Sequence, residues 1–132
     1  MITITLEEIN QFRSQLKDDP KALAALDVIE ECEGYVSDAI SLLLIREKKQ
    51  DSSRSLNELL QKFRKFFCQE EIKDFLESGL IAPIVEPVAV ATGLPVGIVT
   101  ALSICVFKLG AKQFCSTPNP PSQRPEDINP AQ

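Results

Sequence analysis

Apolar residues recur at steps of three and four along most of this chain, which is the spacing of one face of an α-helix. The first stripe begins at Thr5–Glu8, which fits a capping box because the Thr5 hydroxyl can accept the backbone N–H of Glu8. A second helix should begin at Asp19-Pro20, an N-cap residue followed by a proline suited to the first helical position. Its apolar phase holds across Gly34, so the pattern predicts one long helix from Pro20 to about Lys49, with at most a bend at the glycine.

The middle of the chain resumes the helical pattern after a polar loop at 46–55. Ser55–Glu58 fits a second capping box, and an apolar stripe continues from there to Phe67. The stripe shifts by about one residue after Cys68, which predicts a break at Cys68-Gln69 and a new short helix. Gly79 suits the left-handed position that ends such a helix.

Residues 80–107 are the most apolar stretch, with 28 residues and a single charge, Glu86. Pro87 is unsuited to a helix interior, so we expect a short kinked helix at about 82–91. Thr92-Gly93-Leu94-Pro95 predicts a turn, and the last helix should then extend from about Pro95 to Phe114. The two arms would form a central apolar hairpin at about 80–115.

Together these elements predict an all-α fold, a single-domain helical bundle of about five to six helices over residues 1–115. Residues 116–132 hold five of the nine prolines and one large apolar residue, Ile128, so we expect a disordered tail. A chain of 132 residues can bury enough surface to fold without a disulfide or a metal ion.

A membrane-associated hairpin is the alternative to a buried one. The last 20 residues of the apolar stretch, from Val88, carry no charge, which is the formal signature of a transmembrane helix. Gly93 and Pro95 interrupt this window, and the 13 residues of Pro95–Phe107 are too few to cross about 30 Å of hydrocarbon. We therefore favour a soluble core and keep membrane anchoring by residues 80–114 as the alternative.

Composition excludes several classes of function. The chain has no histidine, which removes the commonest general base and metal ligand, and its net charge of −5 argues against nucleic-acid binding. The cysteines at 32, 68, 105 and 115 lack metal-type CxxC spacing, and we interpret them as buried thiols of a reducing cytosol. The first 20 residues lack the apolar core of a signal peptide, so cytoplasmic localisation is expected.

Two sets of apolar or small residues form a possible interaction surface. Leu42, Leu44 and Ile45 belong to a run that is apolar on all sides, which neighbouring helices or a second protomer should enclose. Gly93, Gly97 and Ala101 recur every four residues, a register that lets another helix approach closely. Internal packing is the simpler interpretation of this register, but the surplus apolar surface also predicts a homo-oligomer.

Glu86 is the one candidate for a perturbed carboxylate. A carboxyl group buried among apolar residues has a raised pKa and can act as a general acid or base. The favoured interpretation places Glu86 at a hairpin edge, in water or in an ion pair. No residues form a recognisable catalytic, cofactor-binding or metal-binding set, and the basic run at 46–65 and the acidic patch at 27–38 are typical of solvated surface.

The sequence thus favours a non-enzymatic, cofactor-free helical protein that acts through protein–protein contact, as an adaptor, regulator or scaffold module. An enzyme is the least favoured class because the chain lacks a plausible site.

Overall fold

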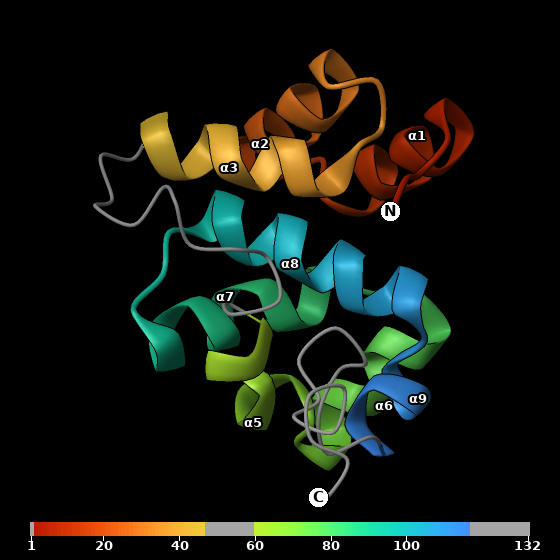
Figure 1. Cartoon of the computed structure of the whole chain (residues 1–132), viewed down its shortest axis with the longest axis vertical. Helices are drawn as coiled ribbons and strands as arrows, with labels where there is room; N and C mark the ends of the chain where they lie inside the picture. Colours follow the sequence, from red (N-terminus) through yellow and green to blue (C-terminus); the bar gives the residue numbers. More distant parts are fainter. Residues whose placement is uncertain (1, 47–59, 117–132) are drawn as a thin grey trace, which may run out of the picture.

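Helix α8, Val96–Leu109, lies at the centre of the computed structural model, which describes residues 2–46 and 60–116 (Figure 1). Every residue from Ile98 to Val106 is buried. Helices α1 to α3 lie on one side of α8, while α5, α6, α7 and α9 lie on the other (Figure 1). The chain is therefore an all-α bundle, as the sequence predicted, with the second arm of the expected hairpin as its core.

The first arm is α7, Ala82–Thr92, which contains Pro87 in its interior. A left-handed Gly93 (φ 76°) ends α7, and the chain direction changes by 119° between α7 and α8. The predicted short helix, turn and longer helix are thus present. Within the described residues no single helix is long and apolar enough to cross a membrane, although the bent α7–α8 pair meets the length and composition requirement when both helices are counted.

The predicted long helix from Pro20 to Lys49 is wrong, because the chain folds there as two helices. Helix α2 spans Pro20–Glu31 and α3 spans Val36–Arg46. Between them Glu33 and Gly34 adopt positive φ angles of 58° and 84°. The N-terminal segment occupies the break: the N–H of Ile4 donates to the carbonyl of Gly34 at 3.0 Å, and Thr3 forms an isolated bridge with Tyr35.

Helix α1, Leu6–Gln15, begins as predicted. The Thr5 hydroxyl accepts the N–H of Glu8, and the Glu8 carboxylate accepts the N–H of Thr5, which completes the capping box. The Asp19 side chain accepts the N–H of Ala22 and so caps α2. Local signals of this kind are reliable because donor and acceptor lie three residues apart.

The second half contains α5, Arg64–Phe67, and α6, Glu70–Ser78, on either side of the predicted break. Gly79 (φ 80°) ends α6 in the left-handed conformation, as expected. The predicted last helix to Phe114 is wrong in its length, because Gly110 (φ 93°) divides it. A separate helix, α9 (Ala111–Ser116), packs against α6 and α8.

The prediction of four free thiols is also wrong. Cys68 and Cys115 form a disulfide that joins the α5–α6 break to α9. Cys105 is a buried free thiol, and Cys32 is a half-buried one. The predicted tail of 116–132 begins one residue too early, because Ser116 belongs to α9. The rest of that tail, the capping box at Ser55–Glu58 and most of the loop at 46–55 lie outside the described residues.

Candidate interaction groove

A groove of about 520 Å³ lies between α2, α3 and the start of α8. Small and apolar residues from these three elements line it: Ala24, Ala25, Val28, Leu43, Pro95, Val96 and Gly97. Four charged residues line it as well: Lys21, Asp27, Glu31 and Arg46. The lining therefore combines apolar and charged side chains, as protein interaction surfaces do.

Gly97 allows this groove to form. A Cβ atom built on Gly97 would lie 3.5 Å from the Cβ of Ala25 and 3.6 Å from the carbonyl oxygen of Lys21. Helix α8 therefore begins in close contact with α2, and any side chain larger than a methyl group would extend into the groove or against α2. Of the predicted register of small residues, Gly97 lies at this contact with α2, whereas a Cβ on Gly93 would have nothing within 4 Å.

The predicted interaction residues fall into two groups. Leu44 and Ala101 are buried in the core and serve internal packing. Ile45 is 57% exposed at the end of α3, Leu42 is half-buried beside it, and Gly93 is exposed in the α7–α8 turn. The end of α3, the α7–α8 turn and the start of α8 lie on the same side of the molecule (Figure 1). The structure thus places the more exposed members of both sets, Leu42, Ile45 and Gly93, at one end of the bundle.

Salt bridges pair some of the charged residues that line the groove. Arg46 lies 3.5 Å from Glu31, and both side chains are more than half exposed. Asp27 binds Arg13 of α1 at 2.8 Å, and Glu30 binds the same guanidinium at 2.5 Å. These hydrogen bonds, that of Glu30 first, raise the pKa of Arg13. Lys21 forms no ion pair with any residue of 2–46 or 60–116, so its ammonium is available to a ligand at the groove.

Glu86 lies on the surface of α7, away from the core side of that helix. Its exposure removes the low-dielectric surroundings that the acid–base hypothesis required. The favoured interpretation, a carboxylate at the hairpin edge in water, agrees with this placement.

The two free thiols lack the properties of a nucleophile. Burial raises the pKa of Cys105 to about 12. Burial, followed by the negative charges of Asp38 and Glu31, raises the pKa of Cys32. A reactive cysteine needs the opposite, a nearby cation or helix N-terminus that favours the thiolate. In the described ranges no group of three or more cysteine, aspartate and glutamate side chains is arranged to hold a metal ion.

The contribution of α2 to the groove was not found in the sequence. The helical spacing of Ala22, Leu26 and Ile29 indicates one apolar face of α2, but Ala25 and Val28 are buried on an adjacent face. The small residues at Ala24-Ala25 are the signal that could have revealed it, because a close helix crossing needs small side chains on both partners.

No protein-family model, curated protein or solved structure matches this chain. The choice of function therefore depends on the geometry of the groove and its surroundings.

Proposed function

We propose that this protein is a non-enzymatic interaction module, an adaptor, regulator or scaffold, whose groove end binds a second copy of the same chain. The observation that carries the proposal is the position of Ile45, which is 57% exposed and directly precedes the groove residue Arg46. Ile45 thus lies in the same turn of α3 as Leu43 and Arg46, which line the groove. An exposed apolar side chain at this end of the bundle suits a reciprocal contact, in which Ile45 of each copy packs against the groove end of the other.

Charge supports a self-complementary contact. The groove carries two cations, Lys21 and Arg46, and two carboxylates, Asp27 and Glu31. In a two-fold dimer the same patch faces itself, so a patch with both signs can pair cation with carboxylate across the axis. A patch of one sign would repel its copy, as like charges at an interface do.

Further apolar surface surrounds the contact. Val90, at the end of α7, is the most exposed large apolar residue in the described ranges, at 80%. Leu94 and Val96 are half-buried where the chain turns into α8. Val90 and Leu94 add apolar area outside the groove lining, and a stable dimer needs such area because it buries about 800 Å² on each partner.

Sedimentation velocity of the full chain over a range of concentrations tests the proposal. The wild-type protein should sediment as a dimer, and Ile45→Asp should sediment as a monomer with unchanged helical circular dichroism. Leu6→Asp is the matched control, since Leu6 is 55% exposed but belongs to α1, near the opposite end of α8. A wild-type monomer at all concentrations, or equal dissociation by both substitutions, contradicts the proposal.

Membrane association through α7 and α8 is the second candidate, favoured by the length and composition of the bent pair. It requires the buried residues of α8 to leave their contacts with α2 and α3, which is why we rank it second. Flotation with phosphatidylcholine–phosphatidylglycerol vesicles distinguishes the two, because only the membrane candidate predicts that the protein floats with the vesicles.

A further inference from the structure

Helix α9 is attached to the rest of the fold at both of its ends. At its start the Glu77 carboxylate accepts the N–H of Lys112. Near its end Arg64 donates to the carbonyl oxygens of Phe114 and Cys115, at 3.0 and 2.8 Å. The disulfide between Cys115 and Cys68 adds a covalent bond at the same end. Three elements, α5, α6 and their connection, therefore hold α9 in place.

Without the disulfide, α9 would be held by these hydrogen bonds and by the packing of Ala111 and Phe114. Gly110 joins α9 to α8 with φ 93° and ψ 104°, and a Cβ placed there would meet only the Cβ of Gln113 within 4 Å. The backbone is therefore uncrowded at the point where its direction changes. A helix of six residues is also too short to persist alone in water, since helix nucleation is costly.

Neither cysteine of the disulfide is fully buried. Cys68 and Cys115 are both half-buried, whereas Cys105 is fully buried. Exchange requires that a thiolate approach one sulfur of the disulfide, so partial exposure of both cysteines matters more than their separation in the sequence.

We propose that Cys68–Cys115 is a thiol–disulfide exchange site for a dithiol reductant, and that its reduction releases α9 from α6. One thiolate of the reductant attacks a protein sulfur, breaks the S–S bond and forms a mixed disulfide. The second thiol then displaces the protein sulfur and closes the disulfide of the reductant. Two electrons and two protons pass to the protein, which gains the thiols of Cys68 and Cys115.

The rest of the bundle keeps its core when α9 leaves. Residues Ile98–Val106 of α8 are buried by the surrounding helices, of which α2, α3 and α7 do not depend on the disulfide. The only fully buried residue that α9 contributes is Ala111. Release would uncover the faces of α6 and α8 beneath α9, together with Phe114, which packs against the core. Reduction would thus create a new apolar surface at this end of the molecule.

Neither cysteine lines the groove, so this inference is independent of the proposed dimer.

Hydrogen–deuterium exchange of the full chain, oxidised and reduced with dithiothreitol, tests the proposal. Peptide mapping of the oxidised protein first checks that Cys68 is linked to Cys115. On reduction, amide exchange in 111–116 should accelerate by about tenfold or more, while the amides of Ile98–Val106 should change far less. The double variant Cys68→Ser/Cys115→Ser should show the fast exchange of α9 without reductant. Cys32→Ser, which retains the disulfide, should respond to dithiothreitol as the wild type does.

Three results overturn the proposal. The first is a protein that retains four free thiols after mild oxidation, since the exchange site would then not exist. The second is α9 exchange that is unchanged by reduction and by the double substitution, which would show that the noncovalent contacts suffice. The third is equal acceleration in α8 and α9, which would make the disulfide a support of the whole fold rather than a bond that controls α9.

Discussion

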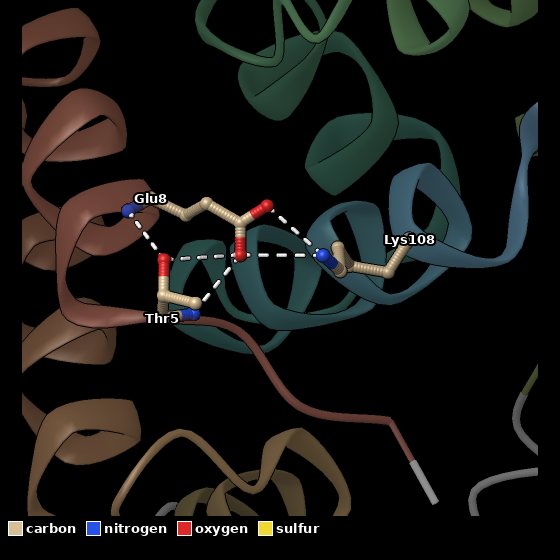
Figure 2. A network of polar contacts seen from close by, with 3 residues as sticks. All are labelled: Thr5, Glu8 and Lys108. Atoms are coloured by element: carbon tan, nitrogen blue, oxygen red, sulfur yellow. Dashed lines mark hydrogen bonds and ion pairs between the residues drawn. The ribbon is translucent and has the colours of Figure 1, made fainter.

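The ammonium of Lys108 lies 2.9 Å from Oε2 of Glu8 and 3.2 Å from its Oε1, although 100 residues separate the two in the sequence (Figure 2). The same carboxylate accepts the N–H of Thr5 at 2.9 Å and so closes the capping box of α1. One side chain therefore stabilises the start of the first helix and also attaches it to the last turn of α8. Lys108 is well placed there because a cation near a helix C-terminus is favourable.

Glu8 should make stability depend on pH in the acid range. Its pKa is lowered, chiefly by the backbone hydrogen bond from Thr5 and then by Lys108. Because the folded state favours the ionised form, the stabilisation is present above the ordinary value of 4.5 and is lost as the pH falls below it. Glu8→Gln should cost about 0.5 to 1 kcal/mol at pH 7, as expected for a partly exposed pair, and less at pH 3. Urea unfolding across this range measures the difference. Glu7→Gln on the same helix turn is the control, and an equal pH dependence of both variants contradicts the assignment.

Gly34 should be intolerant of any side chain, even a methyl group. Its φ of 84° disfavours other residues, and a Cβ would lie 2.2 Å from the carbonyl oxygen of Ile4. Gly34→Ala should therefore cost about 3 kcal/mol or more, from the backbone conformation and from displacement of the N-terminal segment. Gly93→Ala has a similar φ of 76° with nothing within 4 Å and should cost only about 1 kcal/mol. Chemical denaturation of both variants measures the contrast, and similar costs would mean that Ile4 does not restrict this position.

The break between α2 and α3 at Gly34 shows which part of the fold local sequence signals do not predict. Thr5, Asp19 and Gly79 were placed correctly because each acts through neighbours within a few residues. The apolar phase, by contrast, continues unchanged from α2 to α3, and nothing local requires a break. What ends α2 is a partner about 30 residues earlier, the backbone of Ile4, which pairs with Gly34. The Cys68–Cys115 pairing, at a separation of 47, was hidden for the same reason.

The candidate site was predictable only in part. Gly97 and the end of α3 were identified because small residues in register and an all-round apolar run are visible in the sequence. Ala101 lies in the core and Gly97 lines the groove because of where α2 crosses α8. A repeat of small residues every four positions does not specify that crossing point. The charged residues Lys21 and Glu31 were indistinguishable from ordinary helix surface for the same reason.

Gln15 should be far more important than an ordinary surface glutamine. Its Nε2 donates to the carbonyl of Gly79 at 2.7 Å, and its Oε1 accepts the N–H groups of Ile81 and Ala82, at 2.9 and 3.3 Å. It thereby satisfies the backbone between α6 and α7 from the end of α1. Gln15→Ala should cost about 2 kcal/mol, since the N–H of the buried Ile81 would lose its partner. Gln11→Ala, at an exposed position of the same helix, should change the unfolding free energy by less than about 0.5 kcal/mol. Equal effects in urea unfolding would argue against the role of Gln15.

The free thiols should differ in reactivity. Burial raises the pKa of Cys105 to about 12, whereas Cys32 is only half-buried. In the native oxidised protein at pH 8, iodoacetamide should label Cys32 slowly and leave Cys105 unmodified until the protein is unfolded in guanidinium chloride. Labelling of Cys32 should accelerate with rising pH, because its raised pKa keeps the thiolate scarce near neutrality. Mass spectrometry of the peptides provides the measurement, with Cys32→Ser as the control. Rapid native labelling of Cys105 would show that α8 is less enclosed than described.

Gly97 connects the packing of α8 with the proposed groove, and two substitutions separate these roles. A methyl group at this position would make ordinary contacts with Ala25 and Lys21, so Gly97→Ala should be neutral or stabilise the fold by up to about 1 kcal/mol through helix propensity. A leucine side chain would have to enter the groove or push against α2, where Leu43 also lies 3.9 Å from the Cβ position. Gly97→Leu should therefore lower stability by about 1 to 3 kcal/mol, as overpacking does, or fill the groove and prevent dimerisation. Thermal unfolding and sedimentation velocity of the two variants report the two effects. An unchanged melting temperature and an unchanged oligomeric state for Gly97→Leu would refute both the close α2–α8 crossing and the role of the groove.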